Sequence, residues 1–346
     1  MKYITFTVPC YNSQDYMERC IDSLLPGGED VEIIIVNDGS TDATAQIADD
    51  YAARYPGIVR AVHKKNGCHG SGVNKGLELA TGAYFKVVDS DDWLDETAYA
   101  RLLARIRGFC VRKETRLIGE VPDLFVCNYI YDHLEEGTSR VMKYGNVFPT
   151  EEMCDWNDIG RFHASQYLIM HALVFRTEVL RRSGVVLPEH TFYVDNIFAY
   201  QPLPFVGHIF YMNIDLYHYY IGREDQSVNE KVLMSRIDQQ ILVTEIVSKC
   251  VDLNEVREIY PKLAEYMCRN ISIMMAISSI HLLLIDSREA YSKRRQLWKG
   301  IKEENSRLYF RLKYTTLSGL TYLPGKVGGM LTKSGYRAAR KIYQFQ

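Results

Sequence analysis

The sequence has almost no net charge, no closely paired cysteines and no long uncharged apolar run. Its 41 lysine and arginine residues nearly balance 43 aspartate and glutamate residues, which gives a formal charge of −2. No global field therefore draws the whole protein toward nucleic acid. The eight cysteines are scattered and never form a C-x-x-C pair, so we expect reduced, buried thiols rather than disulfides or a zinc site.

Membrane-targeting patterns are also missing. No stretch approaches the ~18 to 20 uncharged apolar residues that cross a bilayer, and the first residues lack the apolar core of a secretion signal. We therefore expect the protein to stay inside the cell. A hydrophobic content of 47% with 24% charged residues excludes a largely disordered chain. With 346 residues, the chain suffices for one large domain with an appendage or for two domains.

The first third alternates short β-branched runs with longer segments of helical period. The pattern predicts strands at 3–8, 32–37, 59–63 and 84–88, separated by helices near 13–25, 41–55 and 70–80. This order implies parallel strands with right-handed crossovers, and therefore an α/β layer structure. Ligands of such folds bind at the carboxyl ends of the strands.

Beyond Trp93 the alternation weakens, although 124–131 and 216–221 are expected to be strands and 177–182 the end of a helix. From about residue 231 to residue 302 the apolar period is helical, which predicts a helical subdomain. We therefore expect an α/β domain over 1–230, a helical subdomain over 231–304 and a separate tail over 305–346.

The tail is basic and aromatic. It contains no acid and eight cations: Arg307, Arg311, Lys313, Lys326, Lys333, Arg337, Arg340 and Lys341. Aromatic and aliphatic residues such as Tyr309, Phe310 and Tyr314 are interleaved with them. This composition is typical of a segment on an anionic membrane surface. Two alternatives stay open: a solvated helix packed on the acidic body of the protein, and a nucleic-acid contact, although no recognition motif accompanies the charge.

Three carboxylates, Asp89, Asp91 and Asp92, directly follow the fourth predicted strand. Like charges this close raise one another's pKa unless a cation neutralises them, so the cluster predicts a divalent metal. Oxygen ligands favour Mg²⁺ or Mn²⁺, which commonly bridge phosphate oxygens, and a metal-bound diphosphate is the expected ligand. The alternative is that Asp92 caps the next helix, but three acids exceed that need.

Two further stretches carry polar, turn-like residues. Asp38 follows the second predicted strand, where its carboxylate can accept from a pyrimidine or a ribose, although Asx turns use the same residues. The glycine-rich stretch 66–76 either brings the backbone close to another group or turns sharply before a helix. It is not the dinucleotide-binding G-x-G-x-x-G motif.

Taken in order, these motifs resemble glycosyltransferase family 2, whose members have a GT-A fold and use nucleotide-diphosphate sugars. The resemblance is strong over residues 1–95, in VPCYN at 8–12, NDGSTD at 37–42, NG at 66–67 with NKGLELATG at 74–82, and DSDDW at 89–93. It implies a mostly parallel GT-A type sheet flanked by helices, with a nucleotide-binding half at 1–95, an acceptor half at 96–230 and a C-terminal helical extension.

The resemblance also implies roles for the matched residues. Pro9, Tyr11 and Asp38 would form the floor for the base, Asp89 would lie near the ribose, and Asp91 would hold the metal on the diphosphate. The remaining nucleotide contacts that it implies are Asn12, Asn66, Gly67, Asn74 and Lys75.

One departure from the family pattern is visible. Family members often carry arginine immediately before the asparagine at position 74, whereas this chain has Val73. The phosphate or sugar contact made by that arginine would then come from Lys75, His69 or Arg223.

Inverting transfer needs a base that deprotonates the acceptor hydroxyl as it attacks the anomeric carbon. In the family this base usually ends a Glu-Asp pair at the start of a helix, and 191–198 resembles that stretch, with Val194 in place of the first acid. Asp195 is therefore the candidate base. The alternative is an ordinary helix N-cap.

A second set of residues is assigned to the diphosphate or the acceptor. The stretch 217–228 resembles a family segment that closes over the diphosphate, and the guanidinium of its arginine suits phosphate oxygens. The full set assigned to the diphosphate or the acceptor is Arg223, Gln226, Ser227, His171, Asp92 and Trp93. A surface ion pair is the alternative for the arginine. A lone histidine in an apolar setting is more often a satisfied core residue.

The sequence therefore predicts an inverting, metal-dependent glycosyltransferase that moves a sugar from a nucleotide diphosphate such as UDP to a glycan or lipid-linked acceptor, in cell-surface polysaccharide or glycolipid synthesis. Mn²⁺ or Mg²⁺ is the expected cofactor. The tail leads us to expect a peripheral position at the inner, cytoplasmic face of the cell membrane. The alternatives are a catalytically silent nucleotide-sugar-binding or scaffolding subunit and a sugar-nucleotide pyrophosphorylase, although the latter would carry a glycine-rich, basic loop after the first strand.

Overall fold

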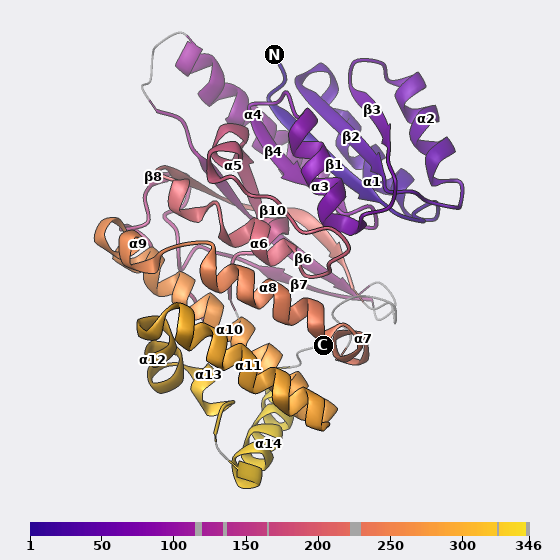
Figure 1. Ribbon diagram of the computed structural model, residues 1–346. Coiled ribbons are helices and arrows are strands. Elements are labelled where there is room, and N and C mark those ends of the chain that lie inside the picture. The colour runs from indigo at the N-terminus through magenta and orange to yellow at the C-terminus, as the bar shows by residue number, and fades with distance from the viewer. Residues whose placement is uncertain (115–119, 134–136, 165, 222–229, 324, 344–346) are drawn as a thin grey trace. The chain divides into compact units, whose positions relative to one another are not determined.

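The computed structural model describes residues 1–114, 120–133, 137–164, 166–221, 230–323 and 325–343. The chain divides into two compact units, Met1–Gly222 and Arg223–Gln346. Figure 1 follows the first unit from indigo to pink and the second from orange to yellow. The described strands all belong to the first unit, and the described part of the second unit is helical. The expected boundary at residue 230 and the separate tail from residue 305 stay predictions.

The sheet of the first unit has ten strands among the described residues. Its order is β3-β2-β1-β4-β9-β6-β10-β5, with β7 paired to β6 and β8 paired to β10. The strands are β1 (Ile4–Cys10), β2 (Val31–Asn37), β3 (Val59–His63), β4 (Tyr84–Val87), β5 (Trp93–Leu94), β6 (Leu124–His133), β7 (Thr138–Met142), β8 (Met153–Cys154), β9 (Leu173–Arg176) and β10 (Ile209–Tyr220). Strands β1 to β4 are parallel, as are β6 and β10, whereas β9 runs antiparallel between β4 and β6.

Strand β1 lies in the middle of the parallel part because its sequence, ITFTVPC, is apolar or β-branched throughout and fully buried. Pro9 is compatible with this position. The carbonyl of Thr7 accepts from the Val88 N–H, so Thr7 faces β4, and Pro9, two residues later, faces the same side. The pairing with β4 has ended before Pro9, so no hydrogen bond is lost because proline lacks an N–H. The chain therefore leaves the sheet here and enters a loop at the carboxyl edge.

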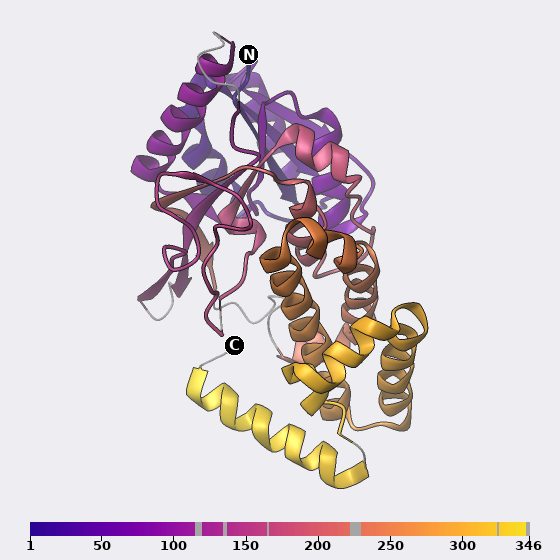
Figure 2. The same cartoon turned by 90° about the vertical axis from the view of Figure 1, so that its left-hand side faces the viewer.

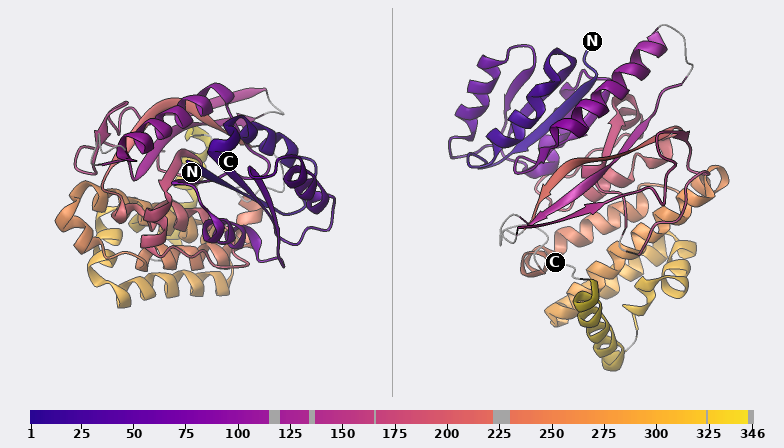
Figure 3. Two further views of the ribbon diagram at one scale, coloured as in Figure 1. Left: turned by 90° about the horizontal axis from the view of Figure 1, so that it is seen from above. Right: turned by 180° about the vertical axis from the view of Figure 1, so that it is seen from behind.

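The helices of the first unit connect these strands. They are α1 (Met17–Leu24), α2 (Thr44–Arg54), α3 (Cys68–Leu79), α4 (Glu96–Glu114), α5 (Thr177–Ser183) and α6 (Asp195–Tyr200), with the 3-10 turns η1 (Leu25–Asp30), η2 (Met170–Ala172) and η3 (Leu203–Phe205). Helix α2 packs beside β3 (Figure 1), and α4 packs against β10, as the view from behind in Figure 3 shows. The predicted α/β fold is confirmed.

Two glycines let α3 approach β1 closely. A Cβ on Gly76 would lie 2.0 Å from Thr7 Oγ1, and a Cβ on Gly72 would lie 2.9 Å from the Cβ of Pro9. No other residue fits these positions without a shift of the strand. The glycine-rich stretch therefore serves close packing of α3 on β1, which is the first of the two uses expected from its sequence, close approach of the backbone.

The second unit is built around one long helix. Its described helices are α7 (Glu230–Ser235), α8 (Ile237–Lys249), α9 (Leu253–Ile259), α10 (Pro261–Ile285), α11 (Arg288–Glu304), α12 (Ser306–Thr315), α13 (Leu317–Leu320) and α14 (Gly325–Tyr343). Helix α10 contacts all the others (Figure 2). In the core, Trp298 is fully buried and donates to Ser279 Oγ at 3.0 Å. The predicted C-terminal helical extension is confirmed.

Helix α10 qualifies one expectation drawn from the sequence. Among the described residues it is the one helix long and apolar enough to cross a membrane, with a mean hydropathy of 1.6, and 61% of that window is buried. The expectation of no such stretch was wrong by length and composition, because the serine, asparagine and histidine residues in this helix interrupt its apolar run without adding charge. The extent of burial is that of a core helix.

Candidate active site

The loops after β1, β2 and β4 are joined by hydrogen bonds at the carboxyl edge of the parallel strands. Asn12, with a φ of 49°, donates its backbone N–H to Ser40 Oγ (3.0 Å) and accepts from the Thr41 N–H through Oδ1 (2.9 Å). The candidate nucleotide residue Asn12 thus fixes the first loop. Its neighbour Tyr11 is 55% exposed and offers its ring at this edge.

Asp38 belongs to a buried polar network at the end of β2. Its side chain is almost fully buried, and Oδ1 accepts from Lys64 Nζ at 2.8 Å, the Gly67 N–H at 3.0 Å and Ser71 Oγ at 3.1 Å. Asn66 donates from Nδ2 to the Asp38 carbonyl at 2.9 Å. The structure brings together the candidates Asp38, Asn66 and Gly67. It adds Lys64 and Ser71, which the motifs did not single out.

Two other candidate nucleotide residues, Asn74 and Lys75, make protein contacts from α3. The side-chain amide of Asn74 donates to the Leu187 carbonyl at 2.8 Å and accepts from the Leu187 N–H at 2.9 Å. Lys75 pairs with Glu78 at 2.7 Å. Asn74 therefore anchors the segment that leads to Asp195, and nucleotide binding by Asn74 and Lys75 stays a prediction.

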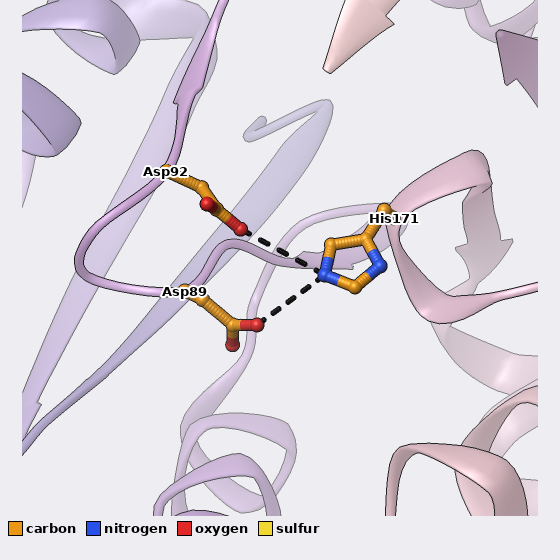
Figure 4. A group of neighbouring side chains, drawn as sticks. All are labelled: Asp89, Asp92 and His171. Atoms are coloured by element: carbon orange, nitrogen blue, oxygen red, sulfur yellow. Dashed lines mark ion pairs between the residues drawn. The ribbon is translucent and has the colours of Figure 1, made fainter. Parts of the chain in front are cut away.

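Asp89, Asp92 and His171 form a cluster in which one ligand atom of each lies within 4.8 Å of the others (Figure 4). His171 Nε2 is 3.4 Å from Asp89 Oδ2 and 3.7 Å from Asp92 Oδ2, and His69 Nε2 is 2.8 Å from Asp89 Oδ1. The two acids follow β4, and His171 lies in η2, directly before β9. Because β9 pairs with β4, the antiparallel insertion of β9 brings the histidine to the acids.

The environment of His171 fits a metal ligand. The residue is 5% exposed, and within the described part of the chain neither ring nitrogen has a hydrogen-bond partner. The ring stacks on Tyr219 with centroids 4.3 Å apart, and the His171 carbonyl accepts from the buried Lys86 Nζ at 2.7 Å. A buried imidazole that is held in place, with one nitrogen facing two carboxylates, suits a divalent cation such as Mn²⁺. Contact of His171 with the acceptor stays a prediction.

The two carboxyl groups of the cluster have opposite pKa shifts. Burial alone would raise the pKa of Asp89, but His69 and His171 hold it well below its usual value. Burial, together with the charges of Asp91 and Asp89, raises the pKa of Asp92 well above its usual value. Crowded acids thus divide into one that stays ionised and one that holds a proton more readily, as like charges do without a cation between them.

Asp92 is not a helix cap, so that alternative was wrong. Its oxygens accept from the Tyr217 hydroxyl at 2.6 Å and from the Tyr220 N–H at 2.9 Å. Asp95 instead caps α4, because its Oδ1 accepts from the Ala98 N–H at 2.8 Å. Asp92 therefore does not cap α4, and its carboxylate faces His171.

Asp91 and Trp93 flank Asp92. Asp91 is half-buried and its charge acts on Asp92, which puts it next to the cluster, and its role as the metal ligand stays a prediction. The Trp93 ring stacks on His218 with centroids 4.9 Å apart, and the Arg19 guanidinium lies 3.1 Å from its centroid. Contact of Trp93 with the diphosphate or the acceptor also stays a prediction.

The candidate base Asp195 is the first residue of α6, and Val194 occupies the cap position, so the N-cap alternative was wrong. Burial raises the pKa of Asp195, while the charges of His171 and His69 lower it and that of Asp89 raises it. Asp195 is therefore within electrostatic reach of the cluster. A carboxylate with a raised pKa is a better proton acceptor near neutral pH, which suits a general base.

Three assigned residues, Arg223, Gln226 and Ser227, lie outside the described residues. The motifs missed three residues that support the cluster: Lys86, Tyr217 and Tyr219. A signal was present, because Tyr217 and Tyr219 alternate along a strand and so face one side of it. A lysine within the apolar run YFKVV is the other signal, since a lysine is almost never fully buried without a partner.

Comparison with known proteins gives a family match for the first third of the chain. Residues 5–110 match the sequence profile described as Glycosyl transferase family 2. This part of the chain has the family 2 sequence pattern. EpsH of Bacillus subtilis, which bears the name of a glycosyltransferase, is 28% identical over 224 residues, which are 63% of this chain and 60% of EpsH. The chain thus spans less than two thirds of the length of this relative.

Solved structures share the fold. TarS 1–349 of S. aureus, solved with UDP-GlcNAc, superposes with a TM-score of 0.68 at 16% identity over 98% of this chain and 92% of that chain. The mannosyltransferase PcManGT of Pyrobaculum calidifontis, solved with GDP-Man and Mn²⁺, gives a TM-score of 0.50 at 14% identity over 96% of this chain and 86% of that chain. The predicted GT-A type fold is confirmed.

Proposed function

We propose that the chain is an inverting glycosyltransferase that takes a sugar from a nucleotide diphosphate and passes it to a hydroxyl of a glycan or lipid-linked acceptor. The observation that carries this proposal is the cluster of Asp89, Asp92 and His171 at the carboxyl edge of a family 2 sheet. Two carboxylates and an imidazole would repel a bare diphosphate. They attract one that arrives with a divalent cation.

UDP is the proposed nucleotide part of the donor. Uracil presents one N–H donor in its ring, and Asp38 is a buried carboxylate that accepts from donors at the same edge of the sheet. Tyr11, exposed beside it, provides an aromatic face on which a base can stack. TarS, which shares the fold, was solved with UDP-GlcNAc, and this supports the choice of uridine.

Mn²⁺ or Mg²⁺ is the proposed cofactor, held by Asp89, Asp92 and His171, with Asp91 as a further ligand. When bound, the cation would stabilise the negative charge that develops on the leaving diphosphate. His69 would hold Asp89 in its ionised form from the other side, at 2.8 Å. Lys86 would fix the turn that carries His171, through the bond to its carbonyl. PcManGT, solved with GDP-Man and Mn²⁺, supports a divalent cation.

Asp195 is proposed to accept the proton of the attacking acceptor hydroxyl. Burial of its carboxyl group raises its pKa against the opposing charges of His171 and His69, which brings its proton affinity closer to what a base needs near neutral pH. Tyr193, two residues earlier, has a φ of 65°, a conformation that L-residues rarely adopt. Strained backbone of this kind clusters at active sites and ligand clamps, which supports a functional position for the start of α6.

Release of nucleotide by the purified chain tests this function. We expect UDP to be released from a UDP-sugar only with Mn²⁺ or Mg²⁺, and Asp89→Asn to abolish the release. Asp50→Asn, at an exposed acid of α2, is the matched control and should keep the wild-type rate. If no UDP- or GDP-sugar raised the melting temperature in the presence of Mn²⁺, the proposal would fail. A chain that bound donors and never released nucleotide would be the silent binding subunit instead.

A further inference from the structure

The last helices of the second unit expose large apolar side chains. Seven of them, each between 51 and 75% exposed, lie on α12, α13 and α14, and we refer to them together as the apolar face: Phe310, Tyr314, Leu317, Leu320, Val327, Met330 and Leu331. The rings of Phe310 and Tyr314 stack on each other with centroids 5.9 Å apart. A concentration of exposed large apolar residues in so short a stretch marks an interaction surface.

Helix α14, the long yellow helix of Figure 2, exposes the apolar residues Val327, Met330 and Leu331. Its inner side is made of small residues: Thr332 is buried, and a Cβ on Gly329 would lie 3.6 Å from Leu283 of α10. Val327 and Met330 are three residues apart, hence on one side of the helix, and both are exposed. An ordinary surface helix has the opposite arrangement, with its large apolar residues facing the core.

The segment that carries the apolar face contains charge of one sign, and one of its cations, Lys333, pairs with Asp286 at 2.8 Å. Residues 305–346 contain eight lysine and arginine residues and no acid. Arg307 on α12 and Arg337 on α14 are exposed, and Lys313 lies between the Tyr309 and Tyr314 rings, 5.3 and 5.2 Å from their centroids. Long cationic side chains can lie along aromatic rings and place their charged groups beside them at the protein surface. The segment therefore combines exposed apolar side chains with exposed positive charge.

We propose that the apolar face docks on the surface of an anionic lipid membrane. The exposed apolar side chains would enter the boundary between headgroups and acyl chains, and the surrounding cations would lie against the anionic headgroups. This proposal goes beyond the glycosyltransferase function and does not rest on it, because vesicle binding requires neither donor nor turnover.

Charge favours a membrane over the other occupants that an apolar face can have. A second copy of the chain, docked through the same face, would bring two segments of eight cations together, and like charges across an interface are costly. An anionic bilayer has negative headgroups that attract the cations and an acyl-chain region that accepts the apolar side chains. Each cation near such a surface contributes about 1 kcal/mol, so the charges and the apolar face act in the same direction.

Co-flotation of the full chain with lipid vesicles tests the proposal. The vesicles are made of phosphatidylcholine alone or of phosphatidylcholine with phosphatidylglycerol. One double variant, Leu317→Ser with Leu320→Ser, removes apolar side chains that are 75 and 60% exposed, and a second, Arg307→Gln with Arg337→Gln, removes exposed cations. Ile259→Ser is the matched control, because Ile259 is 66% exposed on α9 of the same unit and lies outside the apolar face.

We expect the wild type and Ile259→Ser to bind the anionic vesicles and to bind the neutral ones at least tenfold more weakly. The serine variant should lose at least tenfold in partitioning, and the glutamine variant about fivefold for each cation removed, less at high salt. All variants should keep the wild-type melting temperature, because the substituted side chains are exposed.

Four results would overturn the proposal. The first is equal binding to neutral and anionic vesicles, and the second is undiminished binding by both double variants. The third is a wild type that dimerises without lipid while the serine variant sediments as a monomer, since the face would then join two copies. The fourth is a glutamine variant that melts at a lower temperature with unchanged vesicle binding, since the cations would then stabilise the fold.

Discussion

His171 Nε2 lies 3.4 Å from Asp89 Oδ2, although the two residues belong to different ends of neighbouring strands. Lys86, on β4 shortly before Asp89, donates to the His171 carbonyl and so ties the two strand ends together. The contact places a histidine nitrogen beside the carboxylates of Asp89 and Asp92. It also gives the cluster a part that can be removed without disturbing the acids.

Replacing His171 by alanine is expected to weaken Mn²⁺ binding at least tenfold, because the variant loses one of three clustered ligands and keeps both acids. The free Mn²⁺ signal in electron paramagnetic resonance gives the dissociation constant. His63→Ala is the control, since His63 pairs with Asp49 on the surface and lies outside the cluster. Equal affinity in the wild type and in His171→Ala would remove the histidine from the site.

Lys86 makes the stability of the fold depend on pH. Burial lowers the pKa of this lysine from 10.5 to about 8, so between these values the unfolded chain binds the proton more tightly than the folded one. The contribution of Lys86 to the free energy of unfolding should therefore rise as the pH goes from 8 toward 10.5. Below pH 8 the lysine is charged in both states, and there it destabilises the fold most. Urea denaturation of the wild type and of Lys86→Met at pH 8 and pH 10 measures the effect. If the difference between the two proteins were the same at both pH values, Lys86 would not be protonated differently in the two states.

Asp195→Asn should lower the transfer rate about 10²- to 10⁴-fold and leave donor affinity unchanged, because the amide cannot accept the hydroxyl proton. The raised pKa of Asp195 also predicts that the wild-type rate falls on the acid side at a pH above 3.8, the ordinary value for an aspartate. Initial rates across pH and calorimetric titration with UDP check the two parts. A variant with wild-type rates would exclude Asp195 as the base.

Gly76→Ala should destabilise the protein by about 1–3 kcal/mol, because its Cβ would lie 2.0 Å from Thr7 Oγ1 in the packed interface of α3 and β1. Gly108→Ala is the matched control in α4, where the described atoms leave the Cβ position open. It should stabilise the helix by about 0.5–1 kcal/mol. Equal melting temperatures for the two variants would contradict the close approach of α3.

The first third of the fold could be predicted because each strand is a short β-branched run between polar turns, and the sequence period changes clearly at each helix. Further along, β10 runs over Ile209–Tyr220, whereas the alternation indicated only 216–221. Its pairing with β6 shifts register between Met212 and Asp215 and again between Asp215 and Tyr217. These irregularities break the two-residue alternation, so the first half of the strand carries no periodic signal.

The candidate site was predictable to the extent that its residues follow strands in order along the chain. Asp38, Asp89 and Asp92 each end a segment of the parallel part, and their position follows from the topology. His171 could not be assigned to the cluster in the same way. Its place depends on the antiparallel pairing of β9 with β4, two segments that are distant in the sequence. A single histidine in an apolar run does not predict that pairing.

Manganese anomalous diffraction from crystals grown with Mn²⁺ and UDP tests the central claim most directly. The account predicts one strong peak within bonding distance of the carboxylates of Asp89 and Asp92 and of the His171 ring, with the diphosphate of UDP on the open side of the ion. A peak elsewhere, or a nucleotide bound away from this edge of the sheet with the cluster unchanged, would contradict it.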